Sequence, residues 1–309
     1  MSVSYERAPG ALGALGALRL IRLQNCLIAA AAVIIGGYLQ TGSPRLDHLL
    51  LFALAAGLIC GSGNAFNDLL DIESDRINHP GRPLPSGSAS PRDARVAAVT
   101  GSVLGLTISA LLTPTLFMTA ASVTALLLWY NLALKRSSLY GNLMIAALGA
   151  LTVFSGGVAS GAAGVASGAA VVQLPGSAFP ALMAFLLHFA REMIKDVHDL
   201  GGDSAAGLRT FPIRVGATQA LRIISLTVAL IVLASLLPLV LNWYGAWYSV
   251  AVILGVDLPL AVALFRVRRA TTSETLSQAS LAFKLAMVMG LLAVSLESEL
   301  ISSWIEVVN

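Results

Sequence analysis

The sequence predicts an all-α integral membrane protein, in which nine transmembrane helices form one bundle and a single domain spans residues 1–309. Three observations predict this fold. The chain is 57% hydrophobic and only 11% charged, whereas a soluble domain carries about 25% charged residues. Its apolar residues fall into runs that are long enough to cross a bilayer. Its basic residues gather on alternate loops between those runs, as expected for the cytoplasmic side of a membrane protein.

Nine apolar runs follow one another along the chain. A helix needs about 20 mainly apolar residues to cross the hydrocarbon core. The first run follows Arg19 and Arg22, but it is longer than the core of a signal peptide and lacks a convincing small-residue cleavage site. We therefore expect a retained helix, preceded by a flexible segment at 1–17. The predicted cores are 23–39, 46–66, 96–112, 114–130, 139–160, 178–195, 217–241, 244–265 and 281–297.

The loops between these runs predict the orientation. With the N-terminus in the cytoplasm, the cytoplasmic side holds 18 of the 19 basic residues, Lys284 among them, and only Arg45 lies outside. One miscounted helix would destroy this alternation, so the positive-inside rule supports nine helices. The formal net charge of +3 gives no indication of nucleic-acid binding. Cys26 and Cys60 lie in apolar runs and indicate neither a disulfide framework nor a cysteine metal site.

Two acidic clusters lie at the cytoplasmic ends of the second and sixth runs. On a helix, the members of each cluster share an arc of about 60°. They are Asn64, Asp68, Asp71 and Asp75 in the first cluster, and Glu192, Asp196, Asp199 and Asp203 in the second. The second arc requires that the helix continues past Gly201 and Gly202. One acidic stripe alone is often a solvated loop, but two at equivalent loops indicate a site, because carboxylates clustered at membrane depth are rarely idle.

The two stripes would repel each other unless cations lie between them. Hard oxygen ligands that leave positions open for phosphate suit Mg²⁺. Basic side chains on the same loops could hold a diphosphate from the opposite side, although the positive-inside rule explains each of them equally well. These are Arg76, Arg82, Lys135, Arg136, Lys195 and Arg209.

Tyr130 could reach the same cavity or be an interfacial aromatic residue. His198 lies off the face of the acids and is interpreted as a bystander, and Asp257 is a pocket or helix-packing candidate.

The two acidic motifs resemble the signatures of the UbiA superfamily of intramembrane prenyltransferases. The first fits its Asn-Asp-x-x-Asp-x-x-x-Asp motif and the second its Asp-x-x-x-Asp motif, with the matching residues Asn67, Asp68, Asp71, Asp75, Asp199 and Asp203. The segments Arg-Pro-Leu-Pro-Ser-Gly at 82–87 and Gly-Leu-Arg-Thr-Phe-Pro at 207–212 follow them, as similar segments do in that superfamily. The resemblance covers about residues 15 to 297.

Within this superfamily, the segments 22–26, 61–65 and 191–196 are most similar to the digeranylgeranylglyceryl phosphate synthase branch. That branch attaches a second geranylgeranyl chain to geranylgeranylglyceryl phosphate in ether-lipid synthesis. His198 and the pair Gly201–Gly202 stand where acidic residues are frequent in that branch. The Ala- and Gly-rich segment 156–170 is a further departure.

The resemblance implies Mg²⁺-dependent transfer of an isoprenyl group, expected to be geranylgeranyl, from its diphosphate to a lipid acceptor. The implied catalytic residues are Asp68, Asp71, Asp75, Asp199, Asp203 and Lys135. The implied metal ligands are Asn67, Asp68, Asp71, Asp75, Asp196, Asp199 and Asp203. The implied substrate contacts are Arg22, Asn25, Asn64, Arg76, Arg82, Tyr130, Arg136, Glu192, Lys195 and Arg209. Among them, Arg22 and the pair Lys135–Arg136 are the candidates for an acceptor phosphate.

Two other interpretations remain open. A UbiA-type aromatic prenyltransferase of a quinone, homogentisate, chlorophyll or haem pathway would share the metal chemistry and differ in its acceptor. An ion or metabolite transporter would need charges at mid-depth or broken helices in inverted repeats, whereas these acids cluster at one face of the membrane. The expected partners of the enzyme are an isoprenyl diphosphate donor, a lipid or aromatic acceptor and the lipids of the cell membrane, with the active-site cavity at the cytoplasmic side.

Overall fold

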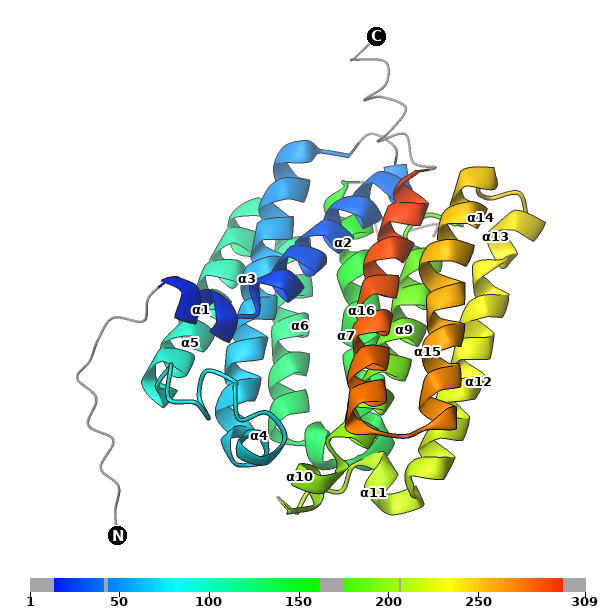
Figure 1. Ribbon diagram of the computed structural model, residues 1–309. Coiled ribbons are helices and arrows are strands. Elements are labelled where there is room, and N and C mark those ends of the chain that lie inside the picture. The colour runs from blue at the N-terminus through cyan, green and yellow to red at the C-terminus, as the bar shows by residue number, and fades with distance from the viewer. Residues whose placement is uncertain (1–13, 42–43, 162–174, 206, 297–309) are drawn as a thin grey trace.

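The structure is a computed structural model that describes residues 14–41, 44–161, 175–205 and 207–296. These residues form long helices packed side by side, without a strand among them (Figure 1). The long helices are α2 (Leu23–Thr41), α3 (Leu46–Leu70), α5 (Pro91–Leu112), α6 (Pro114–Leu132), α7 (Ser138–Ala159), α9 (Ala178–His198), α12 (Ala217–Ser235), α15 (Leu258–Arg269) and α16 (Ser273–Ser295). The short ones are α1 (Ala14–Leu20), α4 (Ile72–Asn78), η1 (Leu134–Arg136), α10 (Leu200–Ala205), α11 (Phe211–Val215), α13 (Leu237–Val240), α14 (Ala246–Val252) and the π-helix η2 (Ile253–Asp257).

The all-α membrane fold is confirmed. Within the described ranges, eight helical segments are long and apolar enough to cross a membrane, and each matches a predicted core. The sixth predicted core forms α9, which packs on α7, α12 and α16 in the same bundle. Its last two turns carry Arg191, Glu192, Lys195 and Asp196, and with these charges α9 is not among the eight segments that are apolar enough. The count of nine spanning helices and the cytoplasmic N-terminus stay predictions, and residues 1–13 of the predicted flexible segment lie outside the described residues.

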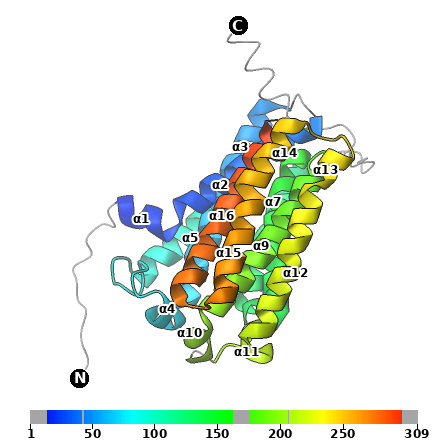
Figure 2. The same ribbon diagram turned by 45° about the vertical axis from the view of Figure 1, so that its right-hand side comes forward.

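The bundle has two halves that meet at α7. Helices α2, α3, α5 and α6 pack together in one half, and α9, α12, α15 and α16 pack together in the other. Each half has its own cluster of buried apolar side chains. Helix α7 packs against α2 on one side and against α9 on the other. When the molecule is turned by 45°, α16, α15 and α12 lie in front of α7 and α9 (Figure 2). The short helices α4, α10 and α11 lie together at one end of the bundle (Figure 1).

Local signals place the helix ends. Thr113 ends α5 with an extended backbone, and its side chain accepts a hydrogen bond from the Leu116 amide at 3.1 Å, so that it caps α6. Pro114 then occupies the first turn of α6, where its missing N–H costs nothing. Thr272 caps α16 through a capping box with Thr275. This cap starts α16 eight residues before its predicted core, and Lys284 therefore lies in the middle of the helix.

Small residues let α2 and α7 approach each other closely, as membrane helices do when no hydrophobic effect drives them together. A Cβ atom on Gly156 would lie 2.0 Å from the carbonyl oxygen of Val33, and one on Gly36 would lie 2.1 Å from that of Val153.

We expect the substitution Gly156→Ala to destabilise the folded protein by roughly 1–3 kcal/mol, the cost of overpacking a tight interface. Thermal unfolding in detergent checks this. Gly81→Ala is the control, because a Cβ there would meet no atom within 4 Å. Equal unfolding temperatures for the two variants would contradict the close contact of α2 and α7.

Candidate active site

The first acidic cluster lies where α3 passes into α4. Asp68 is in the last turn of α3 and only 2% exposed. Asp71 is the C-cap of α3, and its backbone leaves the helical conformation. Asp75 is in α4 and only 3% exposed. The cluster therefore lies on the end of the long helix α3 and on the short helix α4, which join at Asp71, and not on the one continuous helix that the periodicity predicts.

The second acidic cluster repeats this design at the end of α9. Asp199 is the C-cap of α9, and α10 begins at the next residue. Asp203 is in α10 and 9% exposed. The helical path thus does continue past Gly201 and Gly202, with a break at Asp199. In both clusters, one aspartate lies at the break and the next lies on the short helix behind it.

The two clusters meet because α4 packs on α10. The Asn78 side chain donates to the carbonyl oxygen of Asp199 at 3.1 Å and accepts a hydrogen bond from the Gly202 amide at 3.1 Å. A Cβ atom on Gly202 would lie 2.4 Å from the Asn78 side chain and would displace that amide from its two hydrogen bonds. The arrangement joins residues that are more than 120 positions apart in the sequence. The carboxylates of both clusters therefore face one region at the end of the bundle.

Three basic side chains neutralise the first cluster. Arg22, in the turn between α1 and α2, makes an ion pair with Asp68. Arg82 donates to the Asp75 carboxylate at 2.6 Å. Burial raises the pKa of Asp75, although the Arg82 guanidinium opposes that shift.

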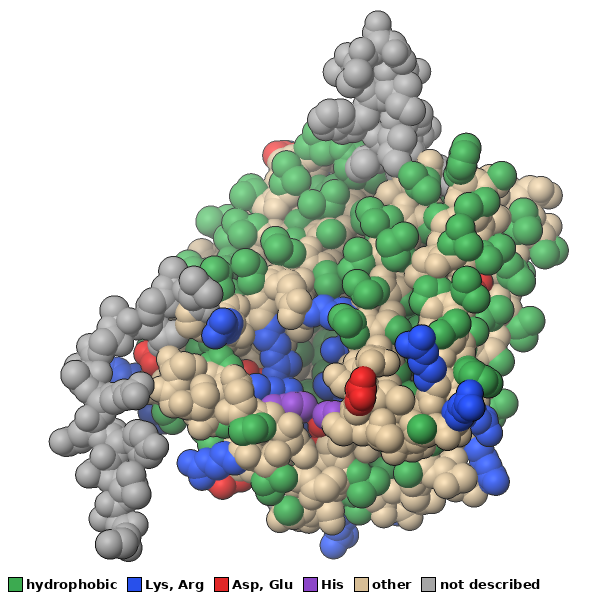
Figure 3. All heavy atoms as spheres, viewed as in Figure 1, with side chains coloured by type: hydrophobic (Ala, Val, Ile, Leu, Met, Phe, Trp, Pro, Cys, Tyr) green, Lys and Arg blue, Asp and Glu red, His purple; other side chains and the backbone are tan. Residues whose placement is uncertain are grey.

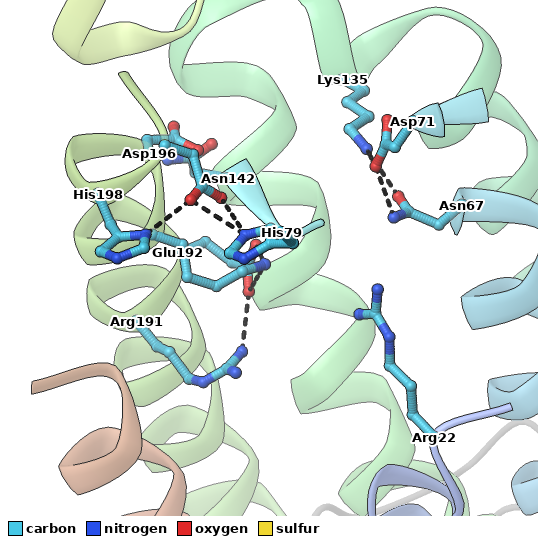
Figure 4. A network of polar contacts seen from close by, with 12 residues as sticks. Arg22, Asn67, Asp71, His79, Lys135, Asn142, Arg191, Glu192, Asp196 and His198 are labelled. Atoms are coloured by element: carbon cyan, nitrogen blue, oxygen red, sulfur yellow. Dashed lines mark hydrogen bonds and ion pairs between the residues drawn. The ribbon is translucent and has the colours of Figure 1, made fainter. Parts of the chain in front are cut away.

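Lys135 completes this neutralisation from η1, on the far side of the cluster. Its ammonium group contacts Asp71 and donates to the Asn67 side chain at 2.9 Å (Figure 4). Asn67 donates to Asp71 at 2.8 Å. Lys135, which is expected to be catalytic, therefore lies between the aspartate at the helix break and the asparagine of the motif.

Two histidines hold Asp199. The ring of His79 lies 3.1 Å from one carboxylate oxygen, and His198 lies 2.8 Å from the same oxygen. The two rings stack with centroids 5.9 Å apart. Burial acts to raise the pKa of Asp199, but the hydrogen bonds from His79 and His198 bring it down to about 2. His198 is therefore no bystander, and the interpretation of it as one is wrong, because its ring contacts the Asp199 carboxylate.

The acids on the α9 side have other partners. Burial raises the pKa of Asp203 to about 6, and the nearby Asp199 and Asp71 carboxylates add to this shift. Asp196 accepts a hydrogen bond from Asn142 of α7 at 2.9 Å. Glu192 is 9% exposed and accepts hydrogen bonds from Lys195 at 2.8 Å and from Arg191 at 3.1 Å (Figure 4).

A cavity of about 310 Å³ lies between the two halves of the bundle, beside these clusters. Its polar end contains Arg22, Asn64, Asn67 and Glu192, and its far end is closed by aromatic and aliphatic side chains such as Tyr248. The space-filling view shows a hollow with basic side chains inside it and histidine at its edge (Figure 3). The cavity therefore joins a charged end to a long apolar interior.

Six of the ten predicted substrate contacts line this cavity, whereas three whose side chains the structure describes, Arg76, Arg82 and Arg209, do not. Asn25, Tyr130 and Lys195 are among the six. Arg82 is held by Asp75 instead. Arg76 pairs with the exposed Glu73 at 2.9 Å, on the outer face of α4. Arg209 is exposed, and its carbonyl oxygen accepts from the Ser138 amide at 3.0 Å. The side chain of Arg136 lies outside the described part of the chain.

Four residues that sequence reasoning did not assign to the site also lie there: His79, Asn142, Arg191 and Lys284. A signal existed for Lys284, because a lysine inside an apolar run marks a functional position by default. Arg191 precedes Glu192 and shares the charged end of α9. Nothing in the sequence pattern distinguishes His79 and Asn142, because their partners come from distant helices.

The chain matches the model of the UbiA prenyltransferase family over residues 27–296. It is 36% identical over 278 residues to the digeranylgeranylglyceryl phosphate synthase of Methanopyrus kandleri, a match that covers 89% of this chain and 96% of that protein. A solved structure of a digeranylgeranylglyceryl phosphate synthase, at 29% identity, superposes with a TM-score of 0.65 over 92% of this chain and 97% of that chain. A UbiA homologue from Archaeoglobus fulgidus bound to GPP and Mg²⁺, at 19% identity, shares the fold with a TM-score of 0.63 over 91% of this chain and 99% of that one.

Proposed function

The chain belongs to the UbiA prenyltransferase family, and from this premise we propose that it transfers a geranylgeranyl group from its diphosphate to geranylgeranylglyceryl phosphate in the cell membrane. It is a multi-pass membrane protein. The relative from Methanopyrus kandleri supports this choice of acceptor, because the match extends over nearly the full length of both chains. The single observation that carries the proposal is the meeting of the two carboxylate clusters beside an apolar cavity.

The carboxylate clusters fit divalent metal ions. Their donors are hard oxygens, which Mg²⁺ prefers. Within the described part of the chain, the Asp75 Oδ2 atom is buried and has no hydrogen-bond partner, so this oxygen has a lone pair available for a metal ion. The proposed ligands are Asn67, Asp68, Asp71, Asp75, Asp196, Asp199 and Asp203. Bound Mg²⁺ neutralises the negative charge that develops on the leaving diphosphate.

The reaction breaks the bond between C1 of the donor and the bridging diphosphate oxygen, and the diphosphate leaves with the electron pair. The hydroxyl oxygen of the acceptor supplies the pair that forms the new C–O bond to C1. Its proton passes to the released diphosphate, which is a stronger base than a carboxylate. All atoms and electrons are then accounted for: the products are an ether lipid and hydrogen diphosphate.

The basic side chains that pair with the first acidic cluster would also bind the donor diphosphate. Arg22, Arg82 and Lys135 each pair with a carboxylate that is also a proposed metal ligand. If those carboxylates held metal ions, the three cations would be free to bind the diphosphate, Arg in bidentate fashion and Lys as a point charge. They would then stabilise charge that is larger in the transition state than in the bound donor.

The interior of the cavity protects the reacting carbon. An allylic cation reacts with any water that reaches it, so the site must exclude water. The walls beyond the polar end are apolar and come from both halves of the bundle, including Val123, Leu148 and Met183. A prenyl tail that fills this space displaces the remaining water and orients C1 toward the acceptor hydroxyl.

A product assay tests the proposal. We expect purified protein in lipid nanodiscs, supplied with geranylgeranyl diphosphate and Mg²⁺, to convert geranylgeranylglyceryl phosphate into a product one geranylgeranyl unit heavier by mass spectrometry. Parallel reactions contain homogentisate or a hydroxybenzoate as the acceptor. Prenylation of an aromatic acceptor alone would contradict the proposed substrate and favour the aromatic branch, while no transfer to any acceptor would contradict the prenyltransferase assignment.

A further inference from the structure

The wall of the cavity formed by α9 and α16 carries basic side chains that form no ion pair with the first acidic cluster. Lys284 lies on α16, eleven residues after Ser273 at its start, which is about 16 Å along the helix. It lines the cavity. No carboxylate among the described residues forms an ion pair with it. A charged side chain this far into an apolar helix is costly unless something compensates it.

The other charges on this wall do not compensate Lys284. Arg191 and Lys195 share the single carboxylate of Glu192, at 3.1 and 2.8 Å. Lys284 lines the same cavity as Arg191 and Arg22, which are also cationic. The Nε atom of Arg191 is buried and has no hydrogen-bond partner within the described ranges. Three cations against one carboxylate leave an excess of two positive charges facing the cavity.

This excess of two positive charges matches the charge of a phosphate monoester. A phosphate monoester carries about −1.5 to −2 charges at neutral pH and offers three acceptor oxygens. A donor diphosphate, in contrast, belongs with the carboxylates and metal ions of the two clusters. Arg191 lies five residues before Asp196 on α9, which places it about 8 Å deeper along the helix. Figure 4 shows Arg191 on the α9 side of the site, across from Arg22 and away from Asn67 and Asp71.

We infer that Arg191, Lys195 and Lys284 form a binding site for the phosphate group of a lipid phosphate monoester, separate from the metal and diphosphate site. This inference rests on the proposed function, since it assigns the headgroup of the acceptor to this wall. The lipid tail of the same molecule would lie in the apolar interior of the cavity, next to this wall. Lys135, which the sequence suggested for the acceptor phosphate, is instead held by Asp71 and Asn67.

The test uses Lys284→Gln in nanodiscs, with Arg266→Gln on the exposed end of α15 as the control. We expect KM for geranylgeranylglyceryl phosphate to rise at least tenfold in Lys284→Gln, because a charge-assisted hydrogen bond is lost. KM for geranylgeranyl diphosphate should stay within twofold of the wild-type value. With geranylgeranylglycerol, which lacks the phosphate, the variant and the wild type should perform alike. A rise in the KM of the donor instead, or an equal loss with both acceptors, would overturn the assignment.

A binding measurement separates this inference from the proposed function. Thermal unfolding is followed with 1-oleoylglycerol 3-phosphate, with 1-oleoylglycerol and with inorganic phosphate, without any turnover. We expect the lipid phosphate alone to stabilise the wild type, and this stabilisation to be absent in Lys284→Gln and retained in Arg266→Gln. Equal stabilisation of Lys284→Gln, or equal protection by inorganic phosphate, would overturn the site even if transfer is observed. A positive result would support the site even if the transfer assay fails.

Discussion

Replacing Asp71 or Asp199 by asparagine is expected to lower the rate of prenyl transfer at least about 1,000-fold, because each change removes a charge that would balance the metal ions at the leaving group. The two aspartates lie at corresponding helix breaks on opposite halves of the bundle. Asparagine keeps the shape of the side chain and most of its hydrogen bonds. Initial rates with saturating geranylgeranyl diphosphate and acceptor, compared with the unfolding temperature of each variant, measure the effect.

Glu73→Gln is the matched control for this experiment. Glu73 lies between Asp71 and Asp75 in the sequence, but it is exposed and pairs only with Arg76 within the described structure. Its replacement should change the rate less than about twofold, as expected for an exposed ion pair. Activity above one tenth of the wild-type value in Asp71→Asn or Asp199→Asn, with the protein folded, would contradict the assignment of that aspartate.

Removing divalent metal ions is expected to abolish transfer completely and reversibly. Without metal charge, Arg22, Arg82 and Lys135 stay paired with the carboxylates of the first cluster and cannot serve a diphosphate. Treatment with EDTA followed by gel filtration should leave no measurable product. Added Mg²⁺ should restore the rate, and added Ca²⁺ should restore it poorly, because its larger and more flexible coordination shell suits the site less well.

Two controls accompany the metal removal. The unfolding temperature after EDTA treatment should show that the bundle stays folded, since its helices pack through apolar cores away from the clusters. The same protein should regain activity when Mg²⁺ is added after an hour without it. A rate that EDTA leaves unchanged would mean that the carboxylates act without metal ions, and the proposed mechanism would be wrong.

The order and length of the helices could be predicted from the sequence because the bilayer imposes a fixed length on each apolar run. Helical spacing grouped Asp68 and Asp75 in one cluster and Asp203 in the other, and the structure shows that all three are buried. The helix breaks at Asp71 and Asp199 could not be predicted. The acids on both sides of each break keep the spacing of a continuous helix, so the sequence pattern is the same with and without a break. Periodicity describes a face of a helix and not its continuity.

The charged wall of α9 and α16 shows a different limit. Lys284 was counted among the basic residues of the cytoplasmic side, although it lies within the predicted core 281–297. The capping box at Thr272 starts α16 at Ser273, and this lysine therefore lies at mid-helix. The partners of Asp199 and Asp196, namely His79 and Asn142, come from other helices. Such long-range contacts depend on the packing of the bundle, which one sequence does not specify.

The binding of Mn²⁺, followed by electron paramagnetic resonance in the presence of a non-hydrolysable geranylgeranyl diphosphate analogue, tests most directly whether both carboxylate clusters hold the same metal centre. We predict that Asp71→Asn and Asp199→Asn each weaken Mn²⁺ binding at least about tenfold, while Glu73→Gln binds like the wild type. Unchanged Mn²⁺ affinity in either aspartate variant would show that its cluster takes no part in the metal centre, and a metal site shared by the two clusters would then be wrong.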